Sequence, residues 1–128
     1  MSVEDHKLLV RRFYKEVVTA GDLDLLDEIA SEDMTDHAAI GMGLGPGRQG
    51  FKGHIEALRR AVPNFHAEVT ELIGEDDLVV VYWTATGTAA VKFLGVAAGQ
   101  SFTVTAISRL RFADGHIVEY QVMVGPVT

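Results

Sequence analysis

The sequence predicts an α+β fold, a cone in which three N-terminal helices pack on a curved antiparallel sheet. Two observations support this prediction. Apolar residues recur with the period of a helix as far as Pro63, and beyond it they alternate with the period of a strand. Helices followed by a run of strands are typical of domains whose helices cover one face of a sheet. With 128 residues and no linker or repeat, we expect one domain over residues 1–128.

The first helix is expected over residues 3–20. Its apolar stripe begins with Leu9 and Phe13, which are one helical repeat apart. Ser2 is the expected N-cap, and Gly21 is expected to end the helix because glycine adopts the left-handed conformation without strain.

Two more helices are expected before the strands begin. The second is short, over residues 23–31, with three apolar side chains on one side: Leu23, Leu26 and Ile29. The third runs from about Gly50 to Val62 and stops before Pro63, because the residue preceding a proline avoids the helical conformation.

The remainder of the chain predicts a meander of strands over residues 66–74, 77–89, 100–112 and 116–124. Asp114-Gly115 is a favoured two-residue hairpin turn. A small sheet that curls around helices leaves a cone whose closed end is core and whose open end can hold one ligand. We therefore expect function to lie in a pocket at the open end.

A glycine-rich segment, "GMGLGPG" at residues 41–47, lies between the second and third helices. Phosphate-binding loops place glycines in defined orders between a buried strand and a helix. Here Pro46 stands where a glycine is required, and no strand is predicted before the segment, so we do not expect a phosphate site. Two alternatives remain: a mobile surface loop, or a lid that folds Met42 and Leu44 over a cavity mouth.

Composition excludes several classes of function. The net charge is −7 and the basic residues are scattered, which argues against a nucleic-acid partner. The absence of cysteine removes disulfides, thiolate zinc sites and thiol nucleophiles, and it fits a reducing cytoplasm. No apolar run approaches the roughly 18 residues of a membrane span, and the charged N-terminus is unlike a signal peptide. We expect a cytoplasmic protein with no membrane partner.

Four motifs follow one another in order: the Asp36-His37 pair, "GFKGHIEALRRAVPNF", "LVVVYWTATGT" and "RFADGHIVEY". Together with the glycine-rich loop they resemble the SnoaL-like polyketide cyclases of the nuclear transport factor 2-like superfamily. The resemblance covers residues 8–121 and implies the cone fold. It leaves the activity open, because this superfamily carries cyclases, isomerases, epoxide hydrolases and binding proteins on one scaffold.

Polyketide cyclases of this kind close a ring by intramolecular aldol addition without metal or cofactor. The family's acidic residue stands near the end of the last strand, and this chain has no Asp or Glu after Glu119. The resemblance therefore implies that Glu119, or the Asp36-His37 pair, transfers the proton on a small hydrophobic substrate. Otherwise the protein is not a cyclase of that type.

Each candidate catalytic group has a structural alternative. Glu119 shares strand parity with Gln121, on a strand with no clearly polar face, so it can equally be a solvated side chain. Asp36 can cap a turn while His37 bonds to the backbone. We expect His54 at the surface or in packing, and we expect no metal site because the histidine spacings of metal sites are absent.

Residues that bind substrate are expected on the helices and strands around the pocket. The resemblance places Tyr14 in the pocket wall, where its phenol would donate a hydrogen bond to a substrate carbonyl, and a polar pocket residue at Ser108. The other expected substrate contacts are Met42, Phe51, Trp83 and Gln121. For Tyr14 and Trp83 the alternative is a role in the core.

Both faces of the strand at residues 77–89 are apolar, with Val81 and Trp83 on one face and Val80 and Tyr82 on the other. Exposed apolar patches above roughly several hundred Å² are rare in monomers. We therefore predict a homodimer through the outer face of the sheet.

Three functions remain open at this point. The first is a cofactor-independent lyase or isomerase that acts in the manner of a polyketide cyclase. The second is an epoxide hydrolase-like enzyme, which needs two carboxylates, or a carboxylate and an arginine, around one oxygen. The third is a non-catalytic module that binds a hydrophobic ligand or forms a dimer.

Overall fold

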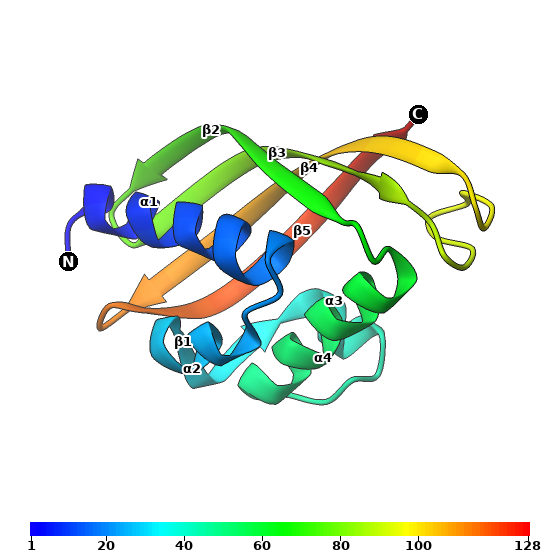
Figure 1. The fold of residues 1–128 in the computed structure, drawn as a ribbon. Helices are drawn as coiled ribbons and strands as arrows, with labels where there is room; N and C mark the ends of the chain where they lie inside the picture. Colours follow the sequence, from blue (N-terminus) through cyan, green and yellow to red (C-terminus); the bar gives the residue numbers. More distant parts are fainter.

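The computed structural model describes residues 1–128 and shows helices packed on one face of a bent sheet (Figure 1). The helical segments are α1 (Val3–Arg12), the π-helix η1 (Phe13–Thr19), the 3-10 turn η2 (Leu23–Leu25), α2 (Leu26–Ile29), α3 (His37–Gly41) and α4 (Gly47–Ala61). The strands are β1 (Ala30–Asp36), β2 (His66–Glu75), β3 (Leu78–Thr88), β4 (Ser101–Ala113) and β5 (His116–Val127). The predicted fold class is confirmed. None of the helices is both long enough and apolar enough to cross a bilayer.

The first helical stretch begins and ends at the predicted residues. The Ser2 hydroxyl accepts the Asp5 N–H, and the Asp5 carboxylate accepts the Ser2 N–H, so both groups cap the first turn. Gly21, with a φ of 79°, terminates the stretch in the left-handed conformation. The second half of the stretch is wound as a π-helix, which the sequence did not predict, and its apolar side chains are all buried: Phe13, Tyr14, Val17 and Val18.

Strand β1 was not predicted. Its sequence, ASEDMTD, lacks the alternation of a strand, and it forms because it pairs in parallel with β5 at the edge of the sheet. The expectation that no strand precedes the glycine-rich loop was therefore wrong. Helix α3, also unpredicted, follows β1 directly, and α4 begins at Gly47 instead of about Gly50.

The sheet has the order β1-β5-β4-β3-β2, and β5 contains a bulge that decides which side chains point inward. Ile117 lies opposite Phe112 and Glu119 lies opposite Arg111, so Val118 is an extra residue between the two pairs. The bulge interrupts the alternation of faces, and Ile117 and Tyr120 are consequently both buried.

The helices cover the inner face of the sheet unevenly. The first helical stretch packs on β2, and α4 packs against β1 on the other side. Between them, Phe13 stacks on Phe51 with ring centroids 5.5 Å apart, and Phe51 contacts Tyr120 at 5.0 Å, which fills the middle of the cone. The end of the sheet near the loop at residues 89–100 has no helix over it (Figure 1).

The close contact between Gly50 of α4 and the glycine-rich loop can be tested by substitution. A Cβ at this position would collide with the backbone carbonyl of Gly45. We expect Gly50→Ala to lower the free energy of unfolding, measured by urea denaturation, by about 1–3 kcal/mol, as overpacking does. The control is Gly41→Ala, where no atom lies within 4 Å of the added carbon. Equal losses in the two variants would contradict this packing.

Candidate active site

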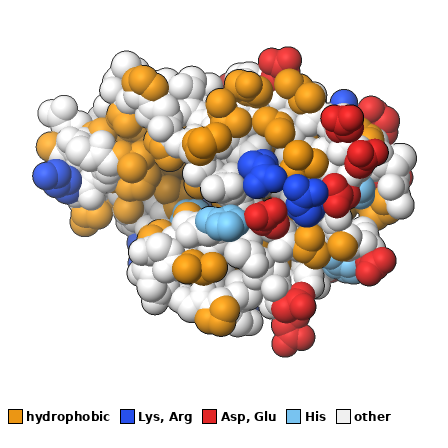
Figure 2. Space-filling model, turned by 180° about the vertical axis from the view of Figure 1, so that it is seen from behind, with side chains coloured by type: hydrophobic (Ala, Val, Ile, Leu, Met, Phe, Trp, Pro, Cys, Tyr) orange, Lys and Arg blue, Asp and Glu red, His pale blue; other side chains and the backbone are white.

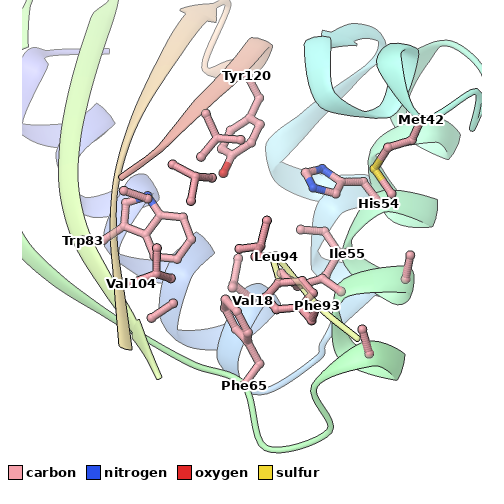
Figure 3. Close-up of a pocket in the computed structure, with 17 residues that line it drawn as sticks. Val18, Met42, His54, Ile55, Phe65, Trp83, Phe93, Leu94, Val104 and Tyr120 are labelled. Atoms are coloured by element: carbon pink, nitrogen blue, oxygen red, sulfur yellow. The ribbon is translucent and has the colours of Figure 1, made fainter. Parts of the chain in front are cut away.

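A cavity of about 330 Å³ opens between α4, the inner face of the sheet and the loop at residues 89–100 (Figure 3). Its wall is formed by Val18, Met42, His54, Ile55, Ala57, Leu58, Ala61, Phe65, Trp83, Ala85, Phe93, Leu94, Val104, Ala106, Tyr120, Val122 and Val124. His54 is the only residue of this wall that is not hydrophobic. Such a lining fits a small apolar molecule that is oriented by few polar groups.

His54 is held by a buried carboxylate. The Nδ1 atom of His54 lies 2.8 Å from Oδ2 of Asp36, whose side chain is 1% exposed. The other carboxylate oxygen, Oδ1, accepts the N–H of Ala38 at 3.0 Å, as an N-cap of α3. An ionised carboxylate can only accept hydrogen bonds, so Nδ1 carries the proton and donates it.

This hydrogen bond sets the tautomer of His54. With the proton on Nδ1, the lone pair of the ring is on Nε2, which makes no hydrogen bond within the protein. Because the ring lines the cavity (Figure 3), a bound molecule can reach this nitrogen. The geometry is that of a general base oriented by a carboxylate.

A second polar group enters the cavity from β5. The Tyr120 hydroxyl lies 3.2 Å from Oγ of Ser108 and 3.4 Å from the Tyr14 hydroxyl, and Ser108 in turn accepts the indole N–H of Trp83 at 2.9 Å. Burial raises the pKa of Tyr120 to about 12 and raises the pKa of Tyr14 well above its usual value. Both phenols therefore keep their protons at neutral pH.

The sequence profile of the SnoaL-like polyketide cyclases matches residues 8–125. The chain belongs to this family. The resemblance found in the sequence motifs is thereby confirmed. No curated protein matches the chain significantly by sequence.

Solved structures share the fold over nearly the whole chain. TsrD from Streptomyces laurentii matches with a TM-score of 0.84 at 20% identity, covering 97% of this chain and 90% of that one. IdmH from Streptomyces antibioticus, a candidate polyketide cyclase, matches with a TM-score of 0.77 at 28% identity, covering 92% and 90%. A candidate polyketide cyclase from Acidithiobacillus ferrooxidans matches with a TM-score of 0.81 at 21% identity, covering 97% and 91%.

The three predicted catalytic groups of this SnoaL-like chain do not meet in the cavity. Asp36 lies behind the cavity wall, where it bonds to the imidazole of α4. His37 and Glu119 bond to each other at 2.8 Å on the outer face of the sheet, where Arg111 and Arg109 lie 3.5 and 3.9 Å from the Glu119 carboxylate. Figure 2 shows this group of basic, acidic and histidine side chains at the surface.

The predicted substrate contacts divide into three groups. Met42 and Trp83 line the cavity, and Met42 lies beside the imidazole (Figure 3). Tyr14 and Ser108 are buried behind the wall, one hydrogen bond away from it. The remaining two lie elsewhere: Phe51 in the core and Gln121 on the outer face, where it accepts from Arg109.

The two residues that bring a polar atom to the cavity wall were both missed by the sequence analysis. His54 was expected at the surface or in packing, although it is next to Ile55 and three residues after Phe51 on the buried side of an amphipathic helix. Its position on this side of the helix could have indicated that it points into the protein. Tyr120 was not singled out, because its inward orientation depends on the bulge in β5.

The His37–Glu119 pair should make the stability of the fold depend on pH in the acid range. The hydrogen bond from His37, together with the nearby Arg109, lowers the pKa of Glu119 below its usual 4.5. A carboxylate with a lowered pKa stabilises the fold above its unfolded-state pKa, and this contribution is lost as the pH falls through the folded-state value. Glu119→Gln should therefore be less stable than the wild type at pH 7, and the difference should shrink below about pH 4.5.

The measurement is urea denaturation at a series of pH values. Glu68→Gln, an exposed position on β2 without an ion-pair partner, is the matched control and should follow the wild type throughout. A difference between wild type and Glu119→Gln that stays constant down to pH 3 would refute the assignment.

Proposed function

We propose that this SnoaL-like protein is a cofactor-independent, cyclase-like enzyme that uses acid–base chemistry on a small hydrophobic carbonyl compound. His54 is the proposed general base, and Asp36 is the residue that positions it. The observation that carries the proposal is the 2.8 Å contact between the buried Asp36 carboxylate and an imidazole on the wall of an apolar cavity. The family and the candidate cyclases with this fold support it.

The chemistry follows from the tautomer. Nε2 of His54 takes a proton from the carbon next to a carbonyl group, and the electrons of that C–H bond form an enolate. The enolate carbon attacks a second carbonyl carbon of the same molecule, which forms a carbon–carbon bond and an alkoxide. The imidazolium then returns its proton to the alkoxide, so the base is regenerated. Asp36 stabilises the imidazolium while it exists.

The lining of the cavity supports this choice of groups. The late-strand acid expected from the resemblance has no counterpart, whereas His54 supplies an ionisable group from α4 instead. An apolar, poorly hydrated site strengthens the interaction between the imidazolium and the carboxylate. No Asp or Glu lines the cavity, so the paired carboxylates that an epoxide hydrolase requires have no counterpart there.

The test is exchange of α-protons with solvent, because it requires only the first step. We expect the wild type to accelerate deuterium exchange at the carbon next to the carbonyl of 2-tetralone, a small apolar ketone, as followed by proton NMR in D₂O. His54→Gln should lower the rate by about 10²–10⁴-fold, the usual contribution of a general base. Asp36→Asn should lower it as well, because an amide has one acceptor oxygen for the two N–H groups, of Ala38 and His54, that the carboxylate accepts.

The matched control is His66→Gln, because this histidine is exposed at the start of β2 and away from the cavity wall. Its exchange rate should equal that of the wild type. Equal rates in wild type and His54→Gln would refute the proposed base. Binding of 2-tetralone without acceleration by the wild type would favour the non-catalytic binding module.

We further propose that the protein forms a homodimer through the outer face of the sheet. Tyr82 and Met123 are 40% and 59% exposed there, on either side of Ile107, with which both are paired. Figure 2 shows hydrophobic side chains gathered on this side of the molecule. A second copy would cover them.

Light scattering should therefore give about twice the chain mass of 13.9 kDa. Met123→Lys should shift the population towards the monomer, because it places a charge in the proposed interface. Leu8→Lys, at an equally exposed apolar position on α1, should leave the mass unchanged. A wild-type mass equal to that of one chain would contradict the dimer.

A further inference from the structure

The polar network behind the cavity has more hydrogens than hydrogen bonds. Trp83, Ser108, Tyr120 and Tyr14 supply one hydrogen each from an indole or hydroxyl group. Three hydrogen bonds join these groups, at 2.9, 3.2 and 3.4 Å: Trp83 to Ser108, Ser108 to Tyr120, and Tyr120 to Tyr14. None of the four groups donates to a backbone carbonyl or to any other side chain. These three hydrogen bonds use three of the four hydrogens.

The positions of the four groups indicate which of them can donate the fourth hydrogen into the cavity. The indole hydrogen of Trp83 is committed to Ser108, because an indole N–H can only donate. Ser108 and Tyr14 are 0% and 1% exposed and do not reach the cavity, so a free hydrogen on either would be a buried, unsatisfied donor. Tyr120 is the only hydroxyl of the network that lines the cavity.

One arrangement of these hydrogens leaves no donor of the three hydrogen bonds unsatisfied inside the protein. Ser108 and Tyr14 both donate to the Tyr120 oxygen, and the Tyr120 hydrogen points into the cavity. A hydroxyl that accepts two hydrogen bonds becomes a stronger donor, because hydrogen bonds in a chain polarise one another. In Figure 3 the Tyr120 oxygen points into the space that the imidazole of His54 also faces.

We infer that Tyr120 is the donor that binds the carbonyl oxygen of the substrate and stabilises the enolate formed there. The inference rests on the proposed function in one respect, the development of negative charge on that oxygen when His54 removes the α-proton. The rings of His54 and Tyr120 have centroids 6.4 Å apart, so one ketone can contact both. The substrate class is thereby narrowed to apolar ketones with an acidic C–H next to the carbonyl.

The test measures the hydrogen bond itself and not turnover. In the His54→Gln protein, which cannot enolise the ligand, the infrared carbonyl stretch of bound 2-tetralone should lie at lower frequency than in hexane. Adding Tyr120→Phe should return the stretch to the hexane position. Adding Tyr14→Phe or Ser108→Ala should reduce the shift only in part, because each removes one donor to the Tyr120 oxygen. Tyr82→Phe on the outer face is the control and should change nothing.

The outcomes separate this inference from the proposed base. A downshift that survives Tyr120→Phe, a ligand that binds without any downshift, or a failure of 2-tetralone to bind would each overturn the donor role. With His54 intact, Tyr120→Phe should also lower α-proton exchange by about 10²–10³-fold, as loss of an oxyanion donor does. A carbonyl downshift together with exchange that is insensitive to His54→Gln would refute the base and leave the donor standing.

Discussion

The contact on which the site depends is the hydrogen bond between Asp36 and His54. It joins the end of β1 to the buried side of α4, two elements that have no local reason to meet. The carboxylate has lost almost all contact with water, and its oxygens are satisfied by one imidazole N–H and one backbone N–H. A buried carboxylate without such partners would be costly. The packing of α4 on β1 and the orientation of the imidazole therefore require each other.

The apolar cavity determines how the Asp36–His54 pair can act on a bound molecule. Its wall is apolar except for the imidazole of His54 and the hydroxyl of Tyr120, so few groups compete for a bound carbonyl compound. Charges that develop in such surroundings interact strongly, because there is little water to screen them. The proposed base on one side and the proposed phenol donor on the other suit a reaction in which one proton leaves carbon while charge collects on oxygen.

The two faces of the sheet carry different kinds of group. The inner face carries the core and the cavity, whereas the outer face carries the ion pairs around Glu119 and the apolar side chains of the proposed dimer contact. The bulge at Val118 makes this separation possible, since it turns Glu119 outward while it leaves both Ile117 and Tyr120 buried. Glu119, the acid that the resemblance implied as a proton-transfer group, thus lies outside the cavity. The ionisable residue of the cavity wall is His54 of α4.

The sequence by itself determined what neighbouring residues encode. Local period and backbone preference predict four features: the capping of α1 by Ser2, the end of the first helical stretch at Gly21, the turn at Asp114-Gly115, and the order of helices and strands. The family was indicated by the resemblance of the motifs and their order. Tertiary structure alone decided the pairing of β1 with β5, the inward turn of Tyr120 and the meeting of His54 with Asp36. Each of these depends on partners far apart in the chain or on a one-residue shift in register, and neither leaves a signal in a short window of sequence.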